Sequence, residues 1–130
     1  MRTAFRFPLS AFAVLALCTL HSALCTSACA DELSECRRLA PKYQAEVEVR
    51  LWDDTRVDLL AKHVAIEVDW APKWAEAIGQ SLYYAQLTDR RPGIILLVKD
   101  EKAERKFVYR CQTVCAKYGI QLFVEKSAEE

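Results

Sequence analysis

Residues 64–70 have the sequence Val-Ala-Ile-Glu-Val-Asp-Trp. Apolar and acidic side chains alternate along it, with Ile66 and Val68 on one side and Glu67 and Asp69 on the other. A period of two is typical of a half-buried strand. The segments on either side of this strand indicate what kind of sheet it belongs to.

The residues before this strand predict two more strands, which form a meander with it. Residues 45–51 alternate strictly, and residues 56–61 alternate after the turn-forming sequence Asp53-Asp54-Thr55. Upstream, residues 34–39 predict a short helix that we expect Pro41 to stop. Two sets of apolar side chains should each face one way: Val47, Val49 and Leu51, and then Val57, Leu59 and Ala61.

The residues after it predict two helices that alternate with two strands. Pro72 opens a helix that runs to Thr88, since proline suits a first helical turn. The apolar run 93–98 indicates a strand covered on both faces, residues 101–118 form a second helix capped by Gly119, and residues 121–125 form the last strand. The expected apolar stripes are Trp74, Ile78, Leu82 and Ala85 on the first helix, and Ala103, Phe107, Cys111, Val114 and Tyr118 on the second.

The predicted fold class is therefore α/β, with the element order α-β-β-β-α-β-α-β. The helical crossovers make the later strands parallel to their neighbours, so we expect one mixed sheet flanked by helices. A length of 130 residues corresponds to a single domain. The balance of 18 Lys and Arg against 18 Asp and Glu excludes a strongly basic coat protein, and 52% hydrophobic residues exclude a disordered chain.

The first thirty residues differ from the rest, because their only charged side chains are Arg2 and Arg6. A positive start, an apolar core over residues 7–20 and small residues up to Ala30 are typical of a secretory signal peptide. We therefore expect a cleaved leader over residues 1–30, a single domain over 31–130, a secreted or periplasmic location and no stable membrane insertion. A membrane anchor and a lipoprotein-type processing site at Cys29 are the alternatives.

Cleavage after Ala30 leaves only Cys36, Cys111 and Cys115, and an odd number does not indicate a disulfide framework. Cys111 and Cys115 lie four residues apart on the second predicted helix, which favours packing over a bridge. A zinc site needs a fourth ligand, and His63 is the one histidine in this part. The state of the cysteines stays open, and so does oligomeric state, a homo-oligomer included.

Three acidic residues of the meander form the candidate chemical site. Glu67 and Asp69 are two apart on one strand and Asp58 lies on the neighbouring strand, so the three carboxylates can converge. Two unit charges about 4 Å apart repel by roughly 4 kcal/mol at an effective dielectric near 20. A hard divalent cation such as Mg²⁺ or Mn²⁺ takes oxygen ligands and would relieve this repulsion.

The helix that follows the acidic strand contributes a second set of polar residues. Lys73, Gln80 and Tyr84 are spaced by seven and four residues, so they share one helical face. The first turn of this helix comes directly after Asp69, which would place the Lys73 ammonium group beside the acids.

These residues together resemble the PD-(D/E)XK nuclease superfamily. Asp58, the sequence Glu67-Val68-Asp69 and the sequence from Gln80 to Tyr84 are similar to its motifs, and the last is similar to the QxxxY element of RecB-type members. The resemblance covers residues 45–125 and implies a restriction-endonuclease-like core. It also implies Mg²⁺-dependent hydrolysis of phosphodiester bonds in DNA or RNA.

The resemblance also implies roles for the individual residues. Asp58 and Glu67 would bind the metal, with Asp69 as a further ligand or general base, and Lys73 would stabilise charge. Gln80 and Tyr84 would position the nucleic acid. The chain departs from the pattern twice: Asp69 stands where the superfamily usually has lysine, and Val57 stands where the motif has proline.

The same residues also have purely structural interpretations. The carboxylates can be the solvent-exposed face of an amphipathic meander, and Gln80 and Tyr84 an ordinary helix surface. Residues 31–130 carry 16 basic and 18 acidic side chains, a balance of −2 that disfavours phosphate binding. The alternative function is therefore a catalytically inactive, exported binding or structural domain that retains the nuclease-like fold. A structural domain whose extra cysteine pairs with a partner is a third interpretation.

Overall fold

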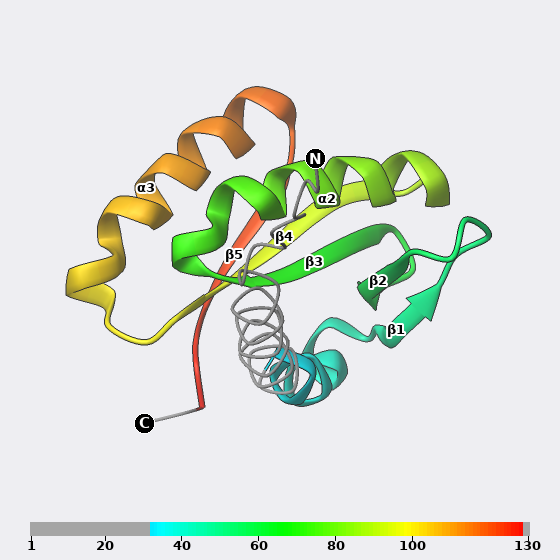
Figure 1. The fold of residues 1–130 in the computed structure, drawn as a ribbon, viewed down its shortest axis with the longest axis horizontal. Helices are drawn as coiled ribbons and strands as arrows, with labels where there is room; N and C mark the ends of the chain where they lie inside the picture. Colours follow the sequence, from blue (N-terminus) through cyan, green and yellow to red (C-terminus); the bar gives the residue numbers. More distant parts are fainter. Residues whose placement is uncertain (1–31, 129–130) are drawn as a thin grey trace, which may run out of the picture. The chain divides into compact units, whose positions relative to one another are not determined.

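The computed structural model describes residues 32–128, which form five strands and three main helices (Figure 1). Residues 32–43 are helical, and a single 3₁₀ turn, η1 (Ala71–Lys73), leads into α2. The remaining elements are β1 (Glu46–Arg50), β2 (Arg56–Leu60), β3 (Val64–Trp70), α2 (Trp74–Thr88), β4 (Arg91–Val98), α3 (Glu101–Tyr118) and β5 (Gln121–Lys126).

The strands form one mixed sheet in the order β1-β2-β3-β4-β5. The first three strands pair antiparallel as a meander, and β3, β4 and β5 are parallel to one another. The α/β class, the meander and the helical crossovers are therefore as predicted. The Val64 side chain of β3 packs over Gly93 of β4, because a Cβ added to Gly93 would lie 2.6 Å from Cγ1 of Val64.

Helices cover both faces of this sheet, as Figure 1 shows. The 32–43 helix packs Cys36 and Leu39 against one face, over Leu59, Ile66 and Val68. The opposite face carries α2 and α3, whose contact with the sheet is made by Ala77, Ile94, Leu96, Cys111, Cys115 and Ile120. The domain therefore has three layers: the 32–43 helix, the sheet, and the layer of α2 and α3.

The ends of the helices have clear local causes. Asp100 caps α3, since its side chain accepts from the backbone N–H groups of Lys102 and Ala103. Gly119 ends α3 with a φ of 68°, as its predicted role as a cap requires. The prediction that Pro41 stops the first helix is wrong, because the helix continues to residue 43 and ends at Gln44, whose φ is 51°. Proline near a helix end removes only one late hydrogen bond.

The predicted apolar stripes of the two later helices are wrong in part. On α2, Trp74 and Ile78 pack against the core, but Leu82 is 39% exposed and the buried side chains are those of Ala77, Ser81 and Tyr84. On α3, Cys111 is buried as predicted, while Ala103 and Tyr118 are exposed and Cys115 is buried instead. Each helix therefore buries a different side from the one that its apolar periodicity predicted.

Cys36, Cys111 and Cys115 are free and buried, and the Sγ atoms of Cys111 and Cys115 are 3.6 Å apart. The packing role predicted for this pair is therefore confirmed. Within residues 32–128, none of the helices is long and apolar enough to cross a membrane. The predicted leader and the cysteines at 18, 25 and 29 lie outside the described residues.

Candidate functional site

The site begins where the ladder between β2 and β3 opens. The two strands pair at Leu59 with Ile66 and at Leu60 with Ala65, and no further pair joins them. The next backbone donor of β3, the N–H of Val68, instead donates to Oδ2 of Asp58 at 2.8 Å. The Asp58 carboxylate therefore accepts the hydrogen bond that a backbone carbonyl of β2 would accept in a regular ladder. The Asp58 side chain thus points toward β3.

The other neighbour of β2 is also irregular at this level. Glu48 of β1 lies opposite Asp58, has a φ of 55°, and does not pair with it, although the pairs on either side form. A positive φ at a non-glycine residue is strained. The prediction that Val57 and Leu59 share one face is wrong, because the two side chains pack in different core clusters. Val47 and Leu51, predicted to share a face of β1, also pack against different clusters.

Asp58 and Glu67 form the first carboxyl pair of the site. Their side chains lie within hydrogen-bonding reach of each other. Glu67 is only 5% exposed, and its Oε2 is buried without a hydrogen-bond partner. Burial, then the nearby charges of Asp58 and Asp69, raises the pKa of Glu67 to about 10, while burial raises that of Asp58 to about 6. At neutral pH the pair therefore shares one proton.

Asp69 and Glu32 form the second pair. Asp69 is 3% exposed, and burial raises its pKa, although hydrogen bonds from Glu32 and the backbone and the charge of Lys73 oppose this. Burial and the hydrogen bond to Asp69 raise the pKa of Glu32 to about 8. Lys73 Nζ lies 3.5 Å from Oδ1 of Asp69. Burial would lower the pKa of Lys73, but the charges of Asp69 and Glu32 outweigh it and raise that pKa.

The two polar residues predicted on α2 differ in their surroundings. Tyr84 is 7% exposed and packs against Val57 and Ala65, so it is a core residue that also faces the acids. Burial, followed by the charges of Glu67 and Asp58, raises its pKa to about 12. Gln80 is exposed, and its side chain hydrogen-bonds to Tyr84.

The structure thus brings together Asp58, Glu67, Asp69 and Lys73, with Tyr84 beside them. The interpretation of these carboxylates as a solvent-exposed face is wrong for Glu67 and Asp69, because helices cover both sides of β3. Sequence reasoning missed Glu32, the first described residue of the 32–43 helix. No local spacing connects it to Asp69, and only the packing of that helix on the sheet does so.

The donor chemistry of the cluster suits a hard divalent cation. All four acidic side chains offer oxygen ligands, and the unpartnered Oε2 of Glu67 lacks the hydrogen bond that a buried carboxyl oxygen normally has. Within the described part of the chain, no three Asp, Glu, His or Cys side chains are already arranged as a metal-binding set. Because the pKa values of Glu67 and Glu32 are raised to about 10 and about 8, a cation that binds these carboxyls at neutral pH would have to displace protons from them.

Comparisons of the chain with protein-family models, with curated proteins and with solved structures found no match.

Proposed function

We propose that this protein is a divalent-metal-dependent nuclease-like enzyme that hydrolyses phosphodiester bonds, in the manner of the PD-(D/E)XK superfamily. The observation that carries the proposal is the pair of Asp58 and Glu67, which meet at the break in the β2–β3 ladder with Oε2 of Glu67 unpartnered. Buried carboxyl groups normally have partners. A cation supplied with a phosphate substrate fits this arrangement.

The roles of the residues follow from their positions. Asp58, Glu67 and Asp69 would hold Mg²⁺ or Mn²⁺, which when bound activates water and polarises the phosphate. Asp69 also holds Lys73, whose side chain is 43% exposed and presents its ammonium group at the rim of the cluster. That group can bind a phosphate oxygen. Tyr84 fixes the floor of the site, and Gln80 extends from it toward solvent.

Two features bear on the resemblance. The element order of the described residues agrees with a restriction-endonuclease-like core, which favours the proposal. Asp69 stands where the superfamily usually has lysine, and Lys73 on η1 supplies a cation to the same place through its contact with Asp69. The positive charge that a lysine at position 69 would carry is therefore present, although it is supplied by Lys73 on η1.

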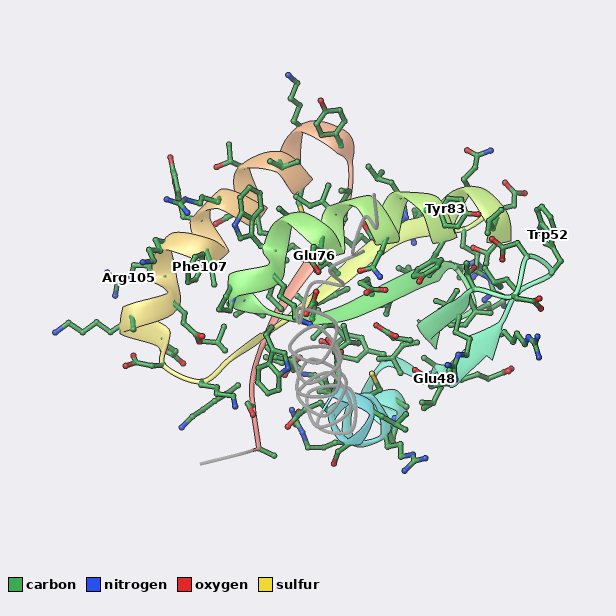
Figure 2. All side chains as sticks on the ribbon, viewed as in Figure 1. Glu48, Trp52, Glu76, Tyr83, Arg105 and Phe107 are labelled. Carbon is green, nitrogen blue, oxygen red and sulfur yellow. The ribbon has the colours of Figure 1, made fainter. Side chains whose placement is uncertain are left out.

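A contact surface for nucleic-acid bases lies on the hairpin next to the site. Trp52, at the β1–β2 turn, is 81% exposed, and the neighbouring Asp53 accepts a hydrogen bond from the hydroxyl of Tyr83 on α2. Figure 2 shows Trp52 and Tyr83 on the same side of the molecule. Exposed aromatic rings stack on bases without regard to sequence, so this surface suits single-stranded DNA or RNA.

The second candidate is an exported, catalytically inactive binding or structural domain with the same fold. The observation that favours it is the pairing of the acids, because two shared protons already relieve the repulsion that a cation would otherwise have to relieve. It predicts no binding of divalent ions at the cluster.

The test uses the full chain with Mg²⁺ or Mn²⁺ and labelled single- and double-stranded DNA and RNA. Asp58→Asn removes the charge but keeps an oxygen that can accept from Val68. Its matched control is Asp54→Asn on the exposed hairpin. We expect metal-dependent cleavage by the wild-type protein and the control, and none by Asp58→Asn. Equal cleavage by all three proteins would show that the activity is not that of this site.

A further inference from the structure

A hollow lies at the other end of β3 from Asp69. It has a volume of about 530 Å³ and is lined by Lys62, His63, Asp89, Arg90 and Arg91. Three different segments build it: the β2–β3 turn, the residue that caps α2, and the start of β4. Its volume lies within the range of pockets that bind small molecules.

The backbone holds these segments in a fixed arrangement. The N–H of Arg91 donates to the carbonyl of His63 at 3.1 Å, and Val64 pairs with Arg91 where β3 and β4 begin. The N–H of Arg90 donates to the carbonyl of Ala85, which anchors it to the last turn of α2. The lining residues therefore come from ordered structure and not from a long loop.

The charge of the hollow is positive. Lys62, Arg90 and Arg91 face a single acidic residue, Asp89, in a domain whose overall balance is negative. Cations near the carboxyl end of a helix complement its dipole, which explains positive charge at the end of α2. That explanation does not account for Arg90, which is half-buried, lines the hollow, and has one guanidinium nitrogen, Nη1, that is buried behind the lining without a hydrogen-bond partner. A guanidinium nitrogen removed from water normally donates to an acceptor.

We propose that this hollow is a phosphate-binding pocket, in which Arg90 donates to the phosphate oxygens and Lys62 and Arg91 supply further charge. Arginine is suited to this role because its planar fork matches the geometry of phosphate oxygens. The phosphate can belong to a small phosphorylated molecule or to a nucleic-acid strand. The first source is independent of the proposed nuclease function, and the second rests on it.

The geometry is compatible with a strand that reaches both sites. His63 directly precedes β3 and is four residues from Glu67 and six from Asp69, so the pocket lies about 13 Å from the first carboxyl pair and about 20 Å from the second. A strand bound in the pocket would thus have to extend about 20 Å to bring another of its phosphates beside Lys73. Binding in the pocket would then align the substrate without taking part in the reaction.

The test measures binding to the full chain in the presence of EDTA, with pyrophosphate and a short single-stranded oligonucleotide as the two probes. Lys62→Gln/Arg91→Gln removes two exposed charges from the pocket, and Arg90→Gln removes its anchor. The matched control, Lys102→Gln/Arg105→Gln, removes two exposed charges from α3, where Figure 2 shows Arg105.

We expect pyrophosphate to bind the wild-type protein, and each pocket variant to weaken binding by about tenfold or more while the control changes it less than about twofold. Asp58→Asn should bind pyrophosphate as the wild type does, which separates this proposal from the nuclease. Tighter binding of the oligonucleotide would assign the pocket to a strand, and tighter binding of pyrophosphate to a small molecule. Absence of binding, or an equal loss in the control, would overturn the proposal. If Arg90→Gln does not fold, the double variant decides.

Discussion

Glu35 and Glu67 are both buried, but their carboxyl groups have different surroundings. Glu35 forms an ion pair with Arg38 and accepts from the backbone N–H of Ala128, so its charge is compensated within the fold. Glu67 lies among acids, and its Oε2 has no partner. The first arrangement stabilises the fold, whereas the second places at β3 a group that the fold alone does not need.

Glu67→Gln should therefore stabilise the metal-free protein, and more so as pH rises. The pKa of Glu67 is about 10 in the folded chain against an ordinary value of 4.5, so between these values folding takes up a proton and the free energy of unfolding falls with pH. Glutamine is neutral throughout and does not lose stability in this way. Urea unfolding in EDTA should show no gain near pH 4 and a gain on the order of 1–3 kcal/mol at pH 8.

The control for this experiment is Glu35→Gln, which breaks the ion pair with Arg38 and weakens the contact with Ala128. This variant should be less stable than the wild type. A Glu67→Gln protein that is destabilised to the same extent at both pH values would mean that Glu67 is an ordinary structural residue.

Asp58→Ala removes the acceptor of the Val68 N–H and leaves that donor buried without a partner. An unsatisfied buried donor costs about 1–3 kcal/mol, so chemical denaturation should show a loss of that order. Asp54→Asn, on the same hairpin but exposed, keeps a residue type that tolerates the φ of 69° at this position and should change stability by less than about 0.5 kcal/mol. Equal effects of the two substitutions would argue against the hydrogen bond that opens the ladder.

At the scale of elements, strand and helix positions were predictable where local pattern decides them. β3 begins and ends where its alternation predicted, and α3 spans the predicted residues because Asp100 and Gly119 define its ends. Which side of a helix is buried was less predictable. On α2, Tyr84 is buried and Leu82 is exposed, since the sheet offers Val57 and Ala65 at the position that Tyr84 reaches.

The same limit applies to the site. Neighbouring strands place Asp58 beside Glu67, so that pair could be predicted from the meander, and Lys73 could be predicted from its position just after Asp69. Glu32 could not, because its contact with Asp69 joins residues far apart in the chain. Pairing along a strand follows a simple period, whereas helix packing across a sheet depends on side-chain shapes.

The packing of Val64 over Gly93 gives a test at this scale. Gly93→Ala would place a Cβ 2.6 Å from Val64 Cγ1, so the Val64 side chain or the strand that carries it would have to shift. We expect a loss of about 1–3 kcal/mol in the free energy of unfolding. Gly79→Ala on α2 meets nothing within 4 Å and should gain about 0.5–1 kcal/mol from helix propensity. In thermal and urea unfolding, the two substitutions should change the free energy of unfolding in opposite directions. A Gly93→Ala variant as stable as the wild type would contradict the packing of Val64 on Gly93.

At the scale of the whole domain, the strand pairing of β2 with β3 is limited to Leu59 and Leu60, and the acids lie beyond that paired segment. The acids are buried there, so their repulsion is weakly screened. A cation that binds in place of the protons on these acids would therefore stabilise the folded protein. Mn²⁺ at a hundred times its dissociation constant should stabilise the protein by about 2.7 kcal/mol. Thermal unfolding should show this for the wild type and not for Asp58→Asn.

The most direct measurement is calorimetric titration of the full chain with Mn²⁺ in buffers of different ionisation enthalpy, which counts the protons released on binding. Glu67 and Glu32 hold protons at neutral pH, with pKa values of about 10 and about 8. We expect one binding event that releases one to two protons at pH 7 and disappears in Asp58→Asn. Absence of binding, or binding that releases no protons and survives in Asp58→Asn, would contradict it.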